Sequence, residues 1–203
     1  MKCFLFVMVG VFLIPMGCSW SRKSESTIQQ DRQFIEESSE PLGYFKEGIQ
    51  LMDKGKKDGA ILAFQKALKI NPDIAVIHNN VAVLFKQKEM FEKAQEHYQK
   101  AIGLDPDNAE VHNNLGILYR EMGKFQDSEK EYLEAIRVSG NFAPAYFNLG
   151  ILYDLYLNQP EDAILYYIHY LKRGGKHRSR IEGWILELEQ RLDWENNNGK
   201  EQD

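Results

Sequence analysis

The sequence has few cysteines, few prolines and no strong excess of charge of either sign. Its 203 residues include two cysteines, Cys3 and Cys18, too few for a disulfide framework or a structural zinc site. Six prolines and fifteen glycines exclude a fibrous or low-complexity chain. The 25 lysines and arginines and 30 aspartates and glutamates give a net charge of −5, which excludes a nucleic-acid binder that relies on bulk positive charge. The 43% hydrophobic content is typical of a globular protein.

An uncharged run near the N-terminus is too short to cross a bilayer. Residues 3–14 carry no charge and follow Lys2. A membrane-spanning helix needs about 20 residues, so we interpret this run as the apolar core of a secretory signal. The run is followed by Pro15-Met16-Gly17-Cys18, which places a small residue directly before a cysteine.

This segment resembles the lipobox of bacterial lipoproteins, although Pro15 and Met16 replace the Leu and the small residue usual in that family. The resemblance implies that residues 1–17 are a removed signal peptide and that a diacylglycerol is attached to Cys18. Ser19 after the cysteine implies the outer membrane of a two-membrane bacterium, with the protein facing the periplasm. An ordinary signal peptide with an incidental cysteine, or an uncleaved anchor, is the alternative.

Residues 18–40 are predicted to be the lipidated cysteine and a flexible tether. The segment is rich in serine, and its hydrophobic residues are too sparse for a core. As a coil it would reach roughly 25 Å and hold the body of the protein away from the membrane surface.

A 34-residue period runs through the rest of the chain. It is carried by Gly48, Ala82, Gly116 and Gly150; by Ala60, Ala94 and Ser128; by Phe64, Tyr98 and Tyr132; by Ala67, Ala101 and Ala135; and by Pro72 and Pro106. The pattern resembles the tetratricopeptide repeat (TPR). The resemblance implies an all-α superhelix of stacked helix-turn-helix units, because one unit cannot bury its apolar face alone. The predicted units are 41–74, 75–108, 109–142 and 143–177.

The C-terminal region carries a further helical pattern. Residues 178–194 are predicted to form a capping helix that covers the exposed end of the fourth unit. Its apolar face consists of Ile181, Trp184, Ile185, Leu188 and Leu192. The polar residues 195–203 are predicted to be a disordered tail.

The sequence contains no motif for catalysis, phosphate binding or a metal. HExxH, GxSxG and a phosphate loop are all missing, so we expect no enzyme activity, no cofactor and no small-molecule substrate. His78 and His112 occupy equivalent positions one repeat apart, and we interpret them as packing residues.

The TPR resemblance implies that the first helices line an inner groove. Asn80, Asn114 and Asn148 share one position in consecutive units, and amides that both donate and accept suit the backbone of an extended peptide. The alternative is that these asparagines are scaffold features of the family. The other predicted groove residues are Lys86 and Arg120, which give a basic edge, and Phe147.

Aromatic residues gather in the fourth unit. Tyr156, Tyr166 and Tyr170 exceed the repeat pattern and form either a partner patch or filling beneath the longer loop. The whole pattern predicts a membrane-anchored adaptor that binds a protein or an extended peptide in its groove. We expect a role in assembling an envelope machine such as a pilus or secretion pore, and no binding of nucleic acid. The alternative function is a periplasmic chaperone or carrier for unfolded chains.

Overall fold

The computed structural model describes the backbone of residues 25–198 and the side chains of residues 39–197. Cys18 and the predicted signal peptide lie outside the described residues. The chain divides into two compact units, Met1–Ser38 and Ser39–Asp203. Residues 25–198 form nine α-helices and no strand, so the predicted all-α fold class is confirmed. The helices are α1 (Glu25–Asp53), α2 (Lys57–Ile70), α3 (Ala75–Lys86), α4 (Phe91–Leu104), α5 (Ala109–Glu121), α6 (Phe125–Val138), α7 (Ala143–Leu155), α8 (Pro160–Lys172) and α9 (Arg178–Asn198).

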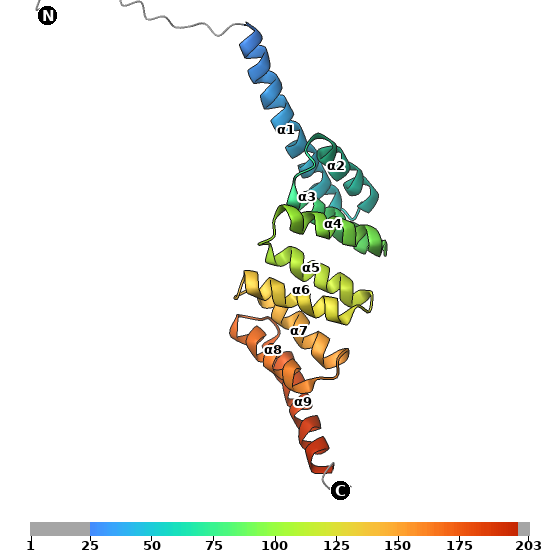
Figure 1. Cartoon of the computed structure of the whole chain (residues 1–203), viewed down its shortest axis with the longest axis vertical. Helices are drawn as coiled ribbons and strands as arrows, with labels where there is room; N and C mark the ends of the chain where they lie inside the picture. Colours follow the sequence, from blue (N-terminus) through green and yellow to red (C-terminus); the bar gives the residue numbers. More distant parts are fainter. Residues whose placement is uncertain (1–24, 199–203) are drawn as a thin grey trace, which may run out of the picture. The chain divides into compact units, whose positions relative to one another are not determined.

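The helices of the second unit pack in consecutive pairs. The pairs α3–α4, α5–α6 and α7–α8 make the most extensive contacts, and each second helix packs on the first helix of the next pair. Figure 1 shows α2 to α8 stacked in sequence order. Each pair buries one face against its neighbour, which is how short amphipathic helices obtain a continuous core.

The small residue of each pair lets an aromatic ring approach the first helix closely. A Cβ added to Gly116 would lie 2.6 Å from the ring of Tyr132, and one added to Gly150 would lie 2.5 Å from the ring of Tyr167. Both rings are almost completely buried. The fourth pair uses Tyr167, one residue later than the 34-residue step, because its connecting turn is longer.

The turns inside the pairs also follow the repeat. Gly55 and Gly123 have φ values of 69° and 74°, and Glu89 at the equivalent position has a φ of 58°. Asn158, in the longer turn of the fourth pair, has a φ of 51°. Glycine and asparagine tolerate this left-handed conformation, whereas glutamate adopts it at a cost.

Two predicted boundaries differ in the structure. Helix α1 already begins at Glu25, so residues 25–40 of the predicted flexible tether are helical. Helix α9 continues to Asn198, so residues 195–198 of the predicted disordered tail are helical as well. Residues 25–40 are polar but rich in Glu and Gln, which favour helix, and residues 195–198 only extend a helix that is already formed. Their polarity indicates the lack of a core, not the lack of a helix.

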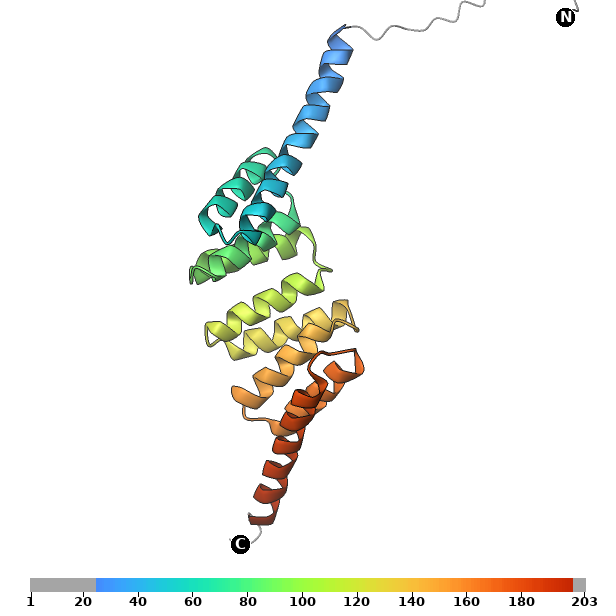
Figure 2. The ribbon, with the colours of Figure 1, turned by 180° about the vertical axis from the view of Figure 1, so that it is seen from behind.

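Helix α9 covers the end of the fourth pair. It packs on α8 and buries Ile181 and Leu188, while the ring of Trp184 lies 5.7 Å from that of Tyr167. Ile185 stands 35 residues after Gly150, at a position that is small in every preceding first helix. In the part of the chain that the structure describes, no further helix packs there, so a large side chain fits. In both views α9 extends past α7 and α8 (Figures 1 and 2).

Candidate functional site

The first helices of the pairs lie along one surface, which we call the first-helix surface. Helix α5 contacts both α3 and α7, so equivalent positions of these three helices become neighbours in space. The predicted groove residues Asn80, Asn114 and Asn148 therefore lie along one surface. Their side chains, however, take part in contacts between repeats.

The asparagines form amide pairs that link successive first helices. The Nδ2 of Asn114 donates to the Oδ1 of Asn79 at 3.2 Å, and the Nδ2 of Asn148 donates to the Oδ1 of Asn113 at 2.8 Å. Asn79, Asn113 and Asn148 are buried. These bonds satisfy polar groups that would otherwise be costly to bury, so they hold the stack together.

This arrangement corrects the prediction of an open asparagine ladder. Asn148 is only 9% exposed and cannot present its amide to a peptide. Among residues 39–197, Asn80 has no amide partner, because Phe45 occupies the position 35 residues earlier. The accepting amides belong to Asn79 and Asn113, the residues directly before Asn80 and Asn114. Both asparagines are visible in the sequence.

The two cations of the predicted basic edge have different surroundings. The Nζ of Lys86 lies 2.8 Å from the Oε1 of Glu121, which neutralises it across the repeat boundary. The guanidinium of Arg120 lies 5.9 Å from the centre of the Tyr156 ring, and its Nη1 is shielded from solvent. Lys86 is therefore neutralised, whereas Arg120 lies near an aromatic ring and has no ion-pair partner among the described residues.

Phe147 does not face an open groove. Its ring stacks on Trp184 of α9 at a centroid distance of 6.3 Å and lies 5.0 Å from the ring of Tyr170. The sequence predicted that residues 178–194 cover the end of the fourth unit, but it did not predict that Trp184 stacks on Phe147.

The three surplus tyrosines are not brought together into one patch. Tyr156 packs on Phe125, and Tyr166 stacks on Tyr153 at 5.4 Å. The hydroxyl of Tyr170 accepts a hydrogen bond from the backbone nitrogen of Lys176 at 2.8 Å. These contacts favour the alternative that the rings fill space between elements. Tyr156 keeps the greatest exposure of the three.

The histidines brace the loops between repeats. The Nε2 of His78 donates to the carbonyl of Pro72 at 2.9 Å, and the Nε2 of His112 donates to that of Pro106 at 3.0 Å. In the fourth unit the hydroxyl of Tyr146 donates to Gly140 at 2.9 Å in the same way. The interpretation of these histidines as packing residues therefore extends to a specific structural hydrogen bond.

The second partner of each histidine differs between repeats. The Nδ1 of His78 lies 3.0 Å from the Nδ1 of His97, and burial together with His78 lowers the pKa of His97 to about 4. The Nδ1 of His112 lies 2.7 Å from Glu131, whose hydrogen bond raises the pKa of His112. Acid is thus expected to act in opposite directions on the second and third repeats.

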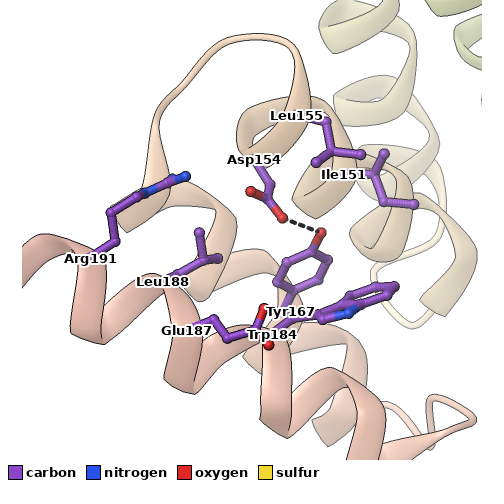
Figure 3. A pocket seen from close by; sticks show the side chains of 8 residues that line it. All are labelled: Ile151, Asp154, Leu155, Tyr167, Trp184, Glu187, Leu188 and Arg191. Carbon is purple, nitrogen blue, oxygen red and sulfur yellow. Dashed lines mark hydrogen bonds between the residues drawn. The ribbon is translucent and has the colours of Figure 1, made fainter.

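A cavity of about 490 Å³ opens where α7, α8 and α9 meet, and we call it the α7–α9 pocket. Figure 3 shows its residues. Its volume is within the usual range for ligand sites, about 300–1,000 Å³. The apolar side chains are Ile151 and Leu155 from α7 and Trp184 and Leu188 from α9. The polar ones are Asp154, Tyr167, Glu187 and Arg191.

Sequence reasoning missed this pocket. It assigned α9 only a capping role and did not place Leu155 beside it. A signal was nevertheless present, since Leu155 and Asp154 interrupt the pattern of the earlier repeats. Arg120 and Glu121 stand at the two equivalent positions, 34 residues before.

The described residues show no sign of a metal site or a membrane span. Residues 25–198 contain no cluster of three or more His, Cys, Asp or Glu side chains suited to a metal ion. In the same part of the chain, no helix has the length and apolar character needed to cross a bilayer.

Comparisons with known families identify the repeats. A family profile described as tetratricopeptide repeat matches residues 41–74 and 109–142, and a profile described as TPR repeat matches residues 84–123. Residues 41–74 and 84–142 therefore carry tetratricopeptide repeats. A search of curated protein sequences found no match.

Solved TPR structures have the same fold. The structure of Pseudomonas aeruginosa pilF is 24% identical, with a TM-score of 0.69, and the match covers 77% of this chain and 71% of that one. A MamA protein is 23% identical, with a TM-score of 0.63 and coverage of 82% and 97%. The first TPR domain of Spaghetti, bound to an HSP90 peptide, is 20% identical, with a TM-score of 0.55 and coverage of 58% and 93%. At these identities the likeness shows the fold alone.

Proposed function

We propose that this chain is a membrane-tethered TPR adaptor that binds a segment of another protein on its first-helix surface and is not an enzyme. The observation that carries the proposal is the α7–α9 pocket. It is an open, largely apolar cavity on a scaffold whose other conspicuous polar side chains are used for internal contacts. TPR domains serve as protein-binding scaffolds, and one structural neighbour is bound to a peptide.

The tether is the second part of the proposal. Gly17-Cys18 follows an uncharged run, and this arrangement supports lipidation of Cys18 and a position at the outer membrane, facing the periplasm. Two or more acyl chains give stable anchoring, at about 0.8 kcal/mol per buried methylene. A place in the assembly of a pilus or secretion pore would suit such an adaptor.

Fractionation and crosslinking in intact bacterial cells test both parts. The wild-type chain should sediment with membranes and crosslink to one dominant, saturable partner. Cys18→Ser should release it from the membrane fraction or leave the precursor unprocessed. Unchanged processing and membrane association of Cys18→Ser would refute the lipid anchor. Capture of many unrelated unfolded proteins, together with suppression of their aggregation, would instead favour a chaperone or carrier.

A further inference from the structure

The α7–α9 pocket combines an apolar wall with carboxylates that the protein does not neutralise. Leu155 at its edge is 69% exposed, more than any other leucine that the structure describes. Trp184 and Leu188 form the facing wall on α9, as Figure 3 shows. A large exposed apolar side chain next to a cavity marks a surface that gains free energy when a partner covers it.

The charge of the first-helix surface changes sign at this pocket. Lys86, Arg120 and Asp154 follow one another at 34-residue steps, so a carboxylate replaces the cation of the earlier repeats. Asp154 accepts one hydrogen bond, from the hydroxyl of Tyr167 at 3.2 Å. Among the described residues, neither Asp154 nor Glu187 has an ion-pair partner, whereas Lys86 is paired with Glu121.

The rest of α9 strengthens the negative field. Between residues 187 and 198 the helix carries Glu187, Glu189, Asp193 and Glu195 against a single cation, Arg191, while Glu182 nearer its start is paired with Arg178. Arg191 does not cancel the carboxylates by direct contact, and its Nε and Nη2 are shielded from solvent and lack an acceptor. Figure 3 shows Arg191 and Glu187 projecting in different directions.

We propose that the α7–α9 pocket binds a partner segment that presents an apolar side chain next to a lysine or arginine. The apolar side chain enters between Leu155 and Trp184, and the cation lies near Asp154 and Glu187. Charge complementarity selects the partner, while the apolar contact supplies most of the affinity. This inference rests on the proposed function and names the chemistry of the segment that the adaptor recognises.

Three dye-labelled, end-blocked peptides provide the test: Ser-Lys-Leu-Lys-Ser, Ser-Gln-Leu-Gln-Ser and Ser-Glu-Leu-Glu-Ser. Binding to the whole chain is followed by fluorescence anisotropy up to millimolar protein, at low and at moderate salt. The lysine peptide should bind most tightly and lose affinity as salt rises, because the carboxylates are exposed to screening. Tighter binding of the glutamate peptide would overturn the proposal and identify Arg191 as the attracting group. No binding of any peptide would also overturn it.

Variants at the pocket have matched controls on the same elements. Leu155→Ala should weaken the lysine peptide roughly tenfold, and Glu187→Gln about threefold at low salt. Leu186→Ala and Glu189→Gln remove exposed side chains of α9 that do not line the pocket, and they should change affinity less than about twofold. Equal effects of the controls would refute the site. Circular dichroism must show equal helix content in all four variants.

Crosslinking in cells separates the two proposals. If both pocket variants retain the dominant partner of the wild type, the adaptor function stands and the pocket is not its binding site. If no partner is captured from cells although the lysine peptide binds in the pocket, the pocket chemistry stands and the adaptor function fails.

Discussion

Replacing one asparagine of a buried amide pair should destabilise the stack, whereas replacing the unpaired asparagine should not. In Asn148→Ala the protein loses the Nδ2 that donates to Asn113 at 2.8 Å. The Oδ1 of Asn113, a residue only 5% exposed, is then left without that partner. In Asn80→Ala no amide pair is broken, because Phe45 stands where the partner would be.

The expected magnitude follows from burial. A buried acceptor left without a donor costs about 1–3 kcal/mol. Both variants also gain a few tenths of a kcal/mol because alanine favours helix more than asparagine does. The difference between Asn148→Ala and Asn80→Ala removes that common gain, so it should be about 1–3 kcal/mol.

Urea denaturation followed by far-UV circular dichroism provides the assay. The slope and the midpoint are both needed, since repeat arrays can lose two-state cooperativity. The double variant Asn113→Ala/Asn148→Ala closes a cycle, in which two residues in contact should show a coupling of about 0.5–3 kcal/mol. A coupling near zero, or an equal loss in Asn80→Ala, would refute the structural role and restore the open ladder as the better interpretation.

Three further predictions test the rest of the fold by the same urea assay. Glu89→Gly should stabilise the protein by about 0.5–1 kcal/mol, because φ is positive there, while Gly123→Ala at the equivalent turn should destabilise it. The reverse order would contradict the strain argument. Burial and the adjacent imidazole of His78 lower the pKa of His97 in the folded chain to about 4. Between pH 6.5 and about pH 4 the unfolded chain therefore binds a proton at His97 and the folded chain does not. The free energy of unfolding should therefore decrease as the pH is lowered through that window, on the order of 1 kcal/mol after solvent screening. His97→Phe should reduce this dependence of stability on pH. An unchanged dependence would exclude His97 as its source. Ile181→Ala should cost about 2–4 kcal/mol if α9 stabilises the fourth repeat, whereas the exposed Leu186→Ala should cost less than about 0.5 kcal/mol.

The sequence by itself determined the repeat architecture. The alternation of small residues and rings at 34-residue steps reflects a local requirement, because a ring such as Tyr132 needs a glycine opposite it within the same pair. Contacts of this kind connect residues close in the chain, so their spacing is visible as a period. The extra residue of the fourth unit was visible in the same way, and Tyr167 takes the ring position there.

Only the tertiary structure decided how the groove residues are used. Whether Asn148 faces a peptide or Asn113 depends on the distance between two helices that are not consecutive, and no spacing within one repeat encodes that distance. The same holds for Phe147, which α9 covers, and for the α7–α9 pocket, whose walls come from three helices. A period fixes which residues are equivalent, but packing between successive units decides which of them remain exposed to bind a partner.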